Sequence, residues 1–415
     1  MPHLRKSKVA ATSDLVSDKS QASAALAHAE PDTPRRTNIF LYSSSRFQKL
    51  LTVITLGSLC LRSLLTTQAA EHPGNIEVDS PEIHADRQVT FRLAAPSATK
   101  VKLRGIQHEP VKMKKDKHGV WSATVGPMAP GIYGYSFVVD GDVMLDPSNP
   151  EIKPERDPDE SELEIPSSTP LLTQWQEVPH GTVHLNDYFS PTLKRVRHLR
   201  IYTPPGYETE TDMRWPVLYL MHGTGDTEAT WTEFGRANYI SDNLIARQAC
   251  QPAIIVMPDG HAYLHDEEGD GQRNLEAMEA DVLEAVVPFV DHLYRTVPDA
   301  NHRAICGLSM GGFQSMFIGL RNQKTFAWVA GMSAYVPDVE KVCVAALKNP
   351  AATNANLRLF WHQIGRNDDL LADQRKFEAA LEKHGIKRQF RVTAGDHDWD
   401  TWRGYLAELL PVLFK

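Results

Sequence analysis

Residues 304–315, AICGLSMGGFQS, decide the fold of the chain, because they place one serine among glycines directly after an apolar run. The apolar residues are typical of a buried strand, and the residues after the serine favour a helix. Gly307 and Gly311 flank Ser309 in the order G-x-S-x-G. Glycine weakens strands and helices, so it is found where the backbone needs a special geometry. The stretch predicts a sharp strand-to-helix turn that holds the Ser309 hydroxyl out at the end of a sheet.

Short apolar runs alternate with amphipathic stretches through residues 172–415. The runs end in glycine or polar residues, as buried strands do. Strands that alternate with helices favour a mainly parallel sheet covered by helices on both faces. We therefore predict an α/β domain over these residues. Its expected strands include WPVLYLMHG, PAIIVMPDG, RAICGL, FAWVAGMSA and LRLFWHQIG.

The segment before this domain has the pattern of a small all-β domain. Apolar and polar residues alternate between glycine and proline breaks, for example in RQVTFRLAAP and GIYGYSFVVDGDVMLDP. Asp140 and Gly141 form a two-residue hairpin signal, because glycine accepts the positive φ that such turns need. These features predict a β-sandwich over residues 71–150. Residues 151–171 are rich in proline and acidic residues, which predicts an extended linker.

The first 70 residues have the order of an export leader. Arg46 and Lys49 precede an apolar run over residues 50–61, and small residues follow up to Ala70. This succession of basic, apolar and small residues is typical of a secretory signal peptide. Because the run is short for a membrane span, a single membrane anchor is the weaker alternative, together with a disordered tail. We expect an exported protein, periplasmic or extracellular, that meets the membrane only through the export signal.

Charge and cysteine content narrow the class of function. The 415 residues carry a net charge of −8, which does not favour a nucleic-acid partner. Three of the four cysteines, Cys250, Cys306 and Cys343, follow the leader, and an odd number does not indicate a disulfide framework. A single bridge between Cys250 and Cys343 stays open at this point. No cysteine spacing indicates metal ligands, so we expect neither a metal nor a cofactor.

A serine at such a turn needs two partners before it can act as a nucleophile. An unactivated hydroxyl is a poor nucleophile, so a base must take its proton and an acid must orient the base. In a fold of this kind the chain order is serine, acid, histidine. The sequence RNDDLL follows the predicted strand LRLFWHQIG. Asp368 or Asp369 is therefore expected at the carboxyl end of a strand, where open α/β sheets build their sites.

His397 is the candidate base. It lies in DHDWDTW, after the predicted strand KRQFRVTAG and before the last helix, so it follows the acid in the expected order. His362 lies within a predicted strand, which favours a position in the core. His384 ends a predicted helix, which favours an exposed position. His397 is therefore the expected partner of Ser309.

Two backbone N–H groups are candidates for binding the negative charge that develops in the reaction. The N–H of Met310 follows the serine at the start of the predicted helix, where the helix dipole adds positive potential. The second candidate lies after VLYLMHG, where His222 and Gly223 let the backbone turn and the N–H of Thr224 can face the serine. An ordinary glycine turn is the alternative for this loop.

The catalytic half, residues 172–415, resembles the esterase-D-like branch of the α/β-hydrolases. This branch includes feruloyl and acetylxylan esterases of carbohydrate esterase family 1, enterochelin esterases and antigen 85. The likeness is carried by LMHGTGDTEATWTEFGRANYISDNLIARQ, IIVMPDG, AICGLSMGGFQS and GRNDDLL. It implies that Ser309 is the nucleophile, Asp368 the acid and His397 the base. It also implies that Thr224 and Met310 donate their backbone N–H groups to the oxyanion.

Residues 75–150 resemble the early-set sandwiches grouped with family-48 carbohydrate-binding modules, on VTFRLAAPSATKVKL and GIYGYSFVVDGDVMLDPSNP. The two likenesses together imply a serine esterase for feruloyl or acetyl esters of plant-wall xylan, which the leader predicts to be exported. Its substrate would be an ester-decorated polysaccharide or a small aryl ester. Three alternatives stay open: a siderophore esterase of the enterochelin type, an acyltransferase of the antigen 85 type, and a glycan-binding protein without catalysis.

Overall fold

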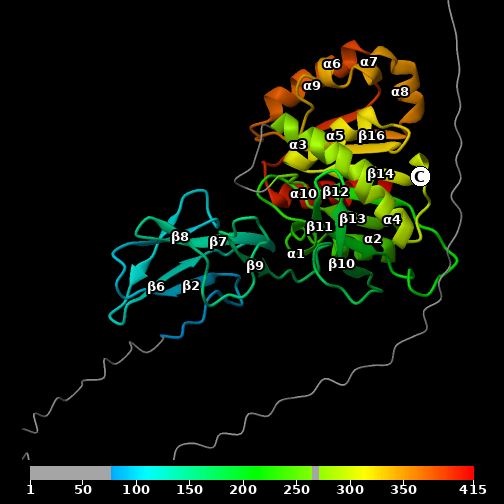
Figure 1. Cartoon of the computed structure of the whole chain (residues 1–415). Coiled ribbons are helices and arrows are strands. Elements are labelled where there is room, and N and C mark those ends of the chain that lie inside the picture. The colour runs from blue at the N-terminus through cyan, green and yellow to red at the C-terminus, as the bar shows by residue number, and fades with distance from the viewer. Residues whose placement is uncertain (1–75, 264–270) are drawn as a thin grey trace, which may run out of the picture. The chain divides into compact units, whose positions relative to one another are not determined.

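The computed structural model describes residues 76–263 and 271–415 (Figure 1). The leader predicted over residues 1–70 lies outside these ranges. In Figure 1 the blue and cyan strands belong to a β-sandwich, and the elements coloured from green to red form a second sheet with its helices. None of the helices in the described ranges is long and apolar enough to cross a membrane.

Two sheets form the sandwich. One has the strand order β1-β2-β6-β5, and the other has the order β4-β3-β7-β8, with β9 also paired to β7. Alternate residues of β2 are buried between the sheets, as a strand with one core face requires. Phe91 of β2 packs on Tyr135 of β7 with ring centroids 4.8 Å apart. The strands are β1 (Glu82–Ile83), β2 (Val89–Ala94), β3 (Val101–Arg104), β4 (Val111–Lys112), β5 (Lys114–Lys115), β6 (Val120–Val125), β7 (Gly131–Val139), β8 (Asp142–Met144) and β9 (Ser161–Ile165).

Strand β9 lies inside the segment predicted as a linker, so the structure differs from the expectation for residues 151–171. β9 pairs antiparallel with the first half of β7, with Ile165 opposite Gly131. Leu163 and Ile165 are buried and belong to the sandwich core. In this strand only Leu163 and Ile165 follow the apolar–polar alternation of a strand. The acidic residues around them give the segment the composition of a linker.

An eight-stranded sheet forms the centre of the second domain. Its strand order is β10-β11-β13-β12-β14-β15-β16-β17. The strands from β12 to β17 pair in parallel, whereas β10 and β11 are antiparallel additions at one edge. The prediction of a mainly parallel sheet is confirmed. The strands are β10 (Thr182–Ser190), β11 (Arg195–Thr203), β12 (Val217–Met221), β13 (Ile254–Pro258), β14 (Arg303–Gly307), β15 (Trp328–Met332), β16 (Leu359–Gly365) and β17 (Gln389–Thr393).

Helices cover both faces of this sheet, because successive strand residues point to opposite sides. In β12, Tyr219 belongs to one core cluster, and its neighbours Leu218 and Leu220 belong to the other. Helices α3, α4, α5 and α9 contribute to the first cluster, and α1, α2 and α10 contribute to the second. The helices are α1 (Thr230–Glu233), α2 (Ala237–Ala246), α3 (Gly271–Asp281), α4 (Val287–Leu293), α5 (Ser309–Arg321), α6 (Val339–Val342), α7 (Val344–Lys348), α8 (Pro350–Asn356), α9 (Leu371–Lys383) and α10 (Trp399–Leu409), with a π-helical turn at Val282–Val286 and 3-10 turns at Ala300–His302 and Leu410–Val412.

The cysteines in the described ranges are free thiols. Cys343 belongs to the core cluster that contains Tyr219, whereas Cys250 packs against the cluster on the opposite face of the sheet. The sheet therefore separates the two thiols, and a bridge between Cys250 and Cys343 is excluded in this fold.

Candidate active site

Ser309 lies at the turn between β14 and α5. Every residue of β14 is buried, and Ser309 begins the helix with a φ of +49°. This left-handed backbone is costly for a residue with a side chain, and such strain is typical of a nucleophile turn. The glycines permit close packing at this turn. A Cβ at Gly307 would lie 2.5 Å from the Gly311 backbone, and one at Gly311 would lie 2.4 Å from the His222 carbonyl oxygen.

Ser309, His397 and Asp368 meet from three separate parts of the chain. His397 Nε2 lies 3.0 Å from Ser309 Oγ, and His397 Nδ1 lies 2.9 Å from Asp368 Oδ2. The three residues follow β14, β17 and β16, so the carboxyl ends of parallel strands supply all three groups. In this arrangement one imidazole nitrogen can accept the hydroxyl proton while the carboxylate holds the N–H of the other. The contact to His397 is made by Asp368, while its neighbour Asp369 is exposed.

The Asp368 carboxylate is buried and well supplied with donors. It is 4% exposed, and its Oδ1 accepts the Leu370 N–H at 2.9 Å. Burial alone would raise the pKa of Asp368. Hydrogen bonds from His397, Ser333 and the Leu370 N–H outweigh burial and hold the pKa below its usual value. Asp368 is therefore ionised at neutral pH, as a group that stabilises an imidazolium must be.

Ser333 and Trp402 extend this network behind the carboxylate. Trp402 Nε1 donates to Ser333 Oγ at 3.0 Å, and the Ser333 hydroxyl donates to Asp368. The Trp402 ring also packs edge-on against the His397 imidazole, with centroids 4.9 Å apart. Ser333 follows β15 with a φ of +51°, and its N–H donates to the Gln363 carbonyl at 2.8 Å. The two side chains thus contact both partners of Ser309.

His222 fixes the loop that carries Thr224. His222 Nε2 accepts the Gly260 N–H at 2.8 Å, so the ring proton lies on Nδ1, which donates to the Gly223 carbonyl at 2.8 Å. The C=O of Gly223 and the N–H of Thr224 belong to one planar trans peptide and point in opposite directions. The imidazole therefore sets the direction of the Thr224 N–H. Met310 supplies the other expected donor from the first turn of α5, where N–H groups have no intrahelical acceptor.

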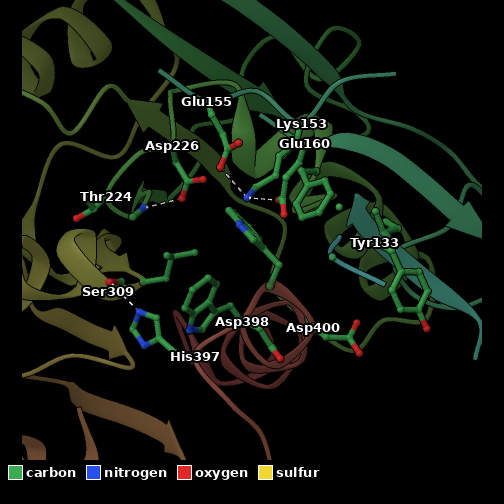
Figure 2. A pocket seen from close by; sticks show the side chains of 18 of the residues that line it. Tyr133, Lys153, Glu155, Glu160, Thr224, Asp226, Ser309, His397, Asp398 and Asp400 are labelled. Atoms are coloured by element: carbon green, nitrogen blue, oxygen red, sulfur yellow. Dashed lines mark hydrogen bonds and ion pairs between the residues drawn. The ribbon is translucent and has the colours of Figure 1, made fainter. Parts of the chain in front are cut away.

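A cavity of about 750 Å³ contains Ser309 and His397 (Figure 2). Thr224 lines the same cavity, as do Trp399 and Trp402 of α10. The sandwich also contributes residues to the wall of this cavity. The sandwich residues that line the cavity are Gly105, Ile106, Gln107, His108, Ile132, Tyr133 and Gly134.

Four of the five residues predicted for the site are thus brought together by hydrogen bonds or by the cavity. Ser309, His397 and Asp368 form one row, and Thr224 lines the cavity beside it. The prediction for Met310, the fifth residue, concerns its backbone N–H alone. The sequence did not indicate Ser333, Trp402 or the orienting contact of His222, because their roles depend on residues far away in the chain. In the described part of the chain, no group of three or more His, Cys, Asp or Glu residues could hold a metal ion.

Two family models match the chain. A model of an esterase family covers residues 190–413, which is more than half of the chain. A model of carbohydrate-binding module 48, described as the isoamylase N-terminal domain, covers residues 79–150. The two matches correspond to the eight-stranded domain and to the sandwich.

The individual proteins that are similar to this chain include esterases, in agreement with the family matches. An endo-1,4-beta-xylanase/feruloyl esterase from Xylanibacter ruminicola is 30% identical over 81% of this chain and 46% of its own length. The chain spans about half the length of the curated relatives it matches. A solved ferulic acid esterase superposes with a TM-score of 0.51 and 29% identity, over 57% of this chain and 98% of the other. The enterobactin esterase of Shigella flexneri superposes with a TM-score of 0.57 over 79% and 92%, but its 20% identity shows the fold alone. The chain therefore belongs to the esterase family of the α/β-hydrolase fold, with a module-48 sandwich in front of its esterase domain.

Proposed function

We propose that this chain is an exported serine esterase that hydrolyses feruloyl or acetyl esters of plant cell-wall polysaccharides. The observation that carries the proposal is the hydrogen-bonded row of Asp368, His397 and Ser309 inside the cavity. Each member of the row has the chemistry that acyl transfer to a serine needs. A protein that only binds glycan needs none of the three.

In the first half of the proposed reaction, Ser309 attacks the ester carbonyl. His397 Nε2 takes the hydroxyl proton as the Oγ–C bond forms, and Asp368 stabilises the resulting imidazolium. The N–H groups of Thr224 and Met310 bind the oxyanion of the tetrahedral intermediate. One such donor typically lowers the barrier by about 3 kcal/mol. His397 then gives its proton to the leaving alkoxide as the ester C–O bond breaks, and the acyl group stays on Ser309.

In the second half, water replaces the alcohol. His397 takes a proton from the water, whose oxygen attacks the acyl carbon. The second tetrahedral intermediate uses the same two backbone donors. It collapses to the free carboxylic acid, and the proton returns from His397 to Ser309 Oγ. Apart from the attacking water, the cycle uses side chains and backbone groups of this chain.

The comparisons support the proposed substrate class. The relative from Xylanibacter ruminicola carries a xylanase together with a feruloyl esterase, and the module-48 match supports a carbohydrate-linked alcohol. The order of residues in the leader supports export to the periplasm or the exterior.

The test is ester hydrolysis by residues 71–415 and by the same protein with Ser309→Ala. We expect release of ferulate from methyl ferulate or of acetate from acetylated xylan, and its loss in the variant. Hydrolysis of p-nitrophenyl acetate alone would keep the mechanism and reject the wall-ester substrates. Hydrolysis that survives in Ser309→Ala would reject the proposed nucleophile.

A further inference from the structure

The sandwich forms one wall of the cavity in which Ser309 lies. Residues 105–108, which begin just after β3, and residues 132–134 of β7 line it together with Ser309 and His397. A substrate that fills the cavity around Ser309 is therefore in contact with both folds.

The alcohol part of the ester is the part that meets this wall. His397 has to protonate the leaving oxygen, so that oxygen lies next to His397 Nε2. Asp398, Trp399 and Asp400 follow His397 directly in the chain and line the same cavity. Asp400 also lies against the sandwich, because a Cβ added at Gly131 of β7 would be 3.9 Å from Asp400 Oδ1.

Carboxylates dominate the charged groups around this part of the cavity (Figure 2). Among the described residues that line it, Lys153 is the single lysine or arginine. The acidic residues that line it are Glu155, Glu160, Asp226, Asp398 and Asp400. The charged side chains around the leaving group are therefore mostly of one sign.

Lys153 does not offer its positive charge to a ligand. Its Nζ lies 2.7 Å from Glu155 Oε1 and 3.0 Å from Glu160 Oε2, and its side chain is 12% exposed. Asp398 and Asp400, in contrast, are exposed. The charge of Asp400 reaches the sandwich wall, since burial raises the pKa of Tyr133 and the Asp400 carboxylate raises it further, while Arg403 lowers it. Lys153 and Arg403 offset part of this charge, since Arg403 Nη1 lies 3.5 Å from Asp400 Oδ1, but the five carboxylates outnumber the two cations.

We propose that this acidic wall selects esters whose alcohol is an uncharged sugar and rejects esters whose alcohol carries an anionic group next to the ester bond. The inference rests on the proposed feruloyl esterase function and adds the alcohol specificity of the same site. A like charge placed in such a cleft raises the energy of the bound state, whereas a neutral sugar can use the carboxylates as hydrogen-bond acceptors.

The experiment compares two feruloyl esters that differ by one charge. In one, ferulate is attached to a ring hydroxyl of methyl glucoside, and in the other to the same hydroxyl of methyl glucuronide. Methyl ferulate, whose alcohol is too small to reach the wall, reports on the proposed function. We expect kcat/KM to be on the order of tenfold lower for the glucuronide ester. Added salt should narrow this difference, because screening weakens the repulsion.

Charge reversal at the wall gives the second measurement. Asp400→Lys should narrow the difference between the two sugar esters. Asp400 is 84% exposed but lies 3.5 Å from Arg403 Nη1, so a thermal melt of the variant has to show that it stays folded. Asp212→Lys is the matched control, because Asp212 is exposed in the loop before β12, at the opposite end of the strand from the site. The control should keep the wild-type difference.

Equal kcat/KM values for the two sugar esters, with methyl ferulate hydrolysed, would overturn the inference and leave the proposed function standing. The inference would also be overturned if Asp400→Lys and Asp212→Lys changed the difference in kcat/KM between the two sugar esters by the same amount. If none of the three feruloyl esters is hydrolysed, the proposed feruloyl function fails and the inference fails with it.

Discussion

Trp402 Nε1 donates a hydrogen bond to Ser333 Oγ, and the Ser333 hydroxyl donates in turn to Asp368. The indole of the last long helix is therefore connected to the Asp368 carboxylate through one buried hydroxyl. The same indole packs on His397, so one side chain contacts both His397 and the serine that donates to Asp368.

Ser333→Ala removes one donor from the Asp368 carboxylate. The Ser333 hydroxyl lowers the pKa of Asp368, so its loss raises this pKa and the carboxylate becomes protonated at a higher pH. We expect kcat to fall about tenfold, in line with the loss of a hydrogen bond to a charged group, and the acidic limb of the pH–rate profile to move to higher pH. Ser241→Ala is the control, since its hydroxyl is buried in α2 without a hydrogen-bond partner in the described structure. An unchanged pH profile in Ser333→Ala would contradict this role.

His222→Leu removes the hydrogen bond to the Gly223 carbonyl. The Thr224 N–H, which belongs to the same peptide, is then no longer held in one direction. We expect kcat to fall by about a hundredfold, as when one oxyanion donor is lost, with a smaller change in KM. His222→Asn should recover part of the loss, because its amide can donate to Gly223 from a similar position. Steady-state kinetics with a thermal melt of each variant separates this effect from unfolding. Full kcat in a folded His222→Leu protein would show that the loop is oriented by other contacts.

Asp368→Asn and Asp369→Asn distinguish the two acids that the sequence left open. The amide at position 368 cannot hold the Nδ1 proton as a charged partner does, so kcat should fall by about three to four orders of magnitude. Asp369→Asn should stay within about twofold of the wild type, since such an exposed substitution has little effect on packing. Hydrolysis of p-nitrophenyl acetate measures both, and the opposite ranking would assign the acid to Asp369.

Glu162 makes the stability of the protein depend on pH. Burial raises the pKa of Glu162 to about 7 even though Arg236 pairs with it. Between the unfolded value of 4.5 and this value, the folded state holds a proton that the unfolded state releases. The contribution of Glu162 to the free energy of unfolding is therefore complete below about pH 4.5, falls as the pH rises, and is lost above about pH 7.

Glu162→Gln should remove this dependence, which has a maximal slope of about 1.4 kcal/mol per pH unit. Urea unfolding between pH 5 and pH 8 measures the slope for both proteins. Glu164→Gln is the control, because Glu164 lies on the same strand, contacts the same arginine at 3.5 Å and is 36% exposed. If Glu164→Gln reduces the slope as much as Glu162→Gln does, the pH dependence of stability would be assigned to Arg236 and not to Glu162.

The parts of the fold that the sequence predicts are those with local causes. The glycines around Ser309 are required by the close packing of one turn, and buried parallel strands are recognisable as apolar runs. His397 and the Asp368–Asp369 pair could be found because the order of serine, acid and histidine follows from the topology of the sheet. The choice between the two aspartates needed the structure or the family resemblance, since neighbouring residues of one loop have the same sequence context.

The residues that escaped prediction act through distant contacts. Ser333 is 69 residues from Trp402 in the chain, and a serine after a strand is too common to indicate a role. The sequence showed His222 as part of a turn but not that Gly260 fixes its tautomer from 38 residues away. β9 escaped because pairing with β7, rather than its own composition, makes it a strand.

Arg403 joins the two folds through backbone groups. Its guanidinium donates to the carbonyl oxygens of Phe234 and of Ile132, which is a residue of the sandwich. Every amino acid carries a carbonyl, so these acceptors survive almost any substitution at their positions, while the arginine has no equivalent replacement. This contact between the sandwich and α10, the helix that follows His397, can therefore persist during evolution while the side chains at positions 132 and 234 change, as long as Arg403 is kept.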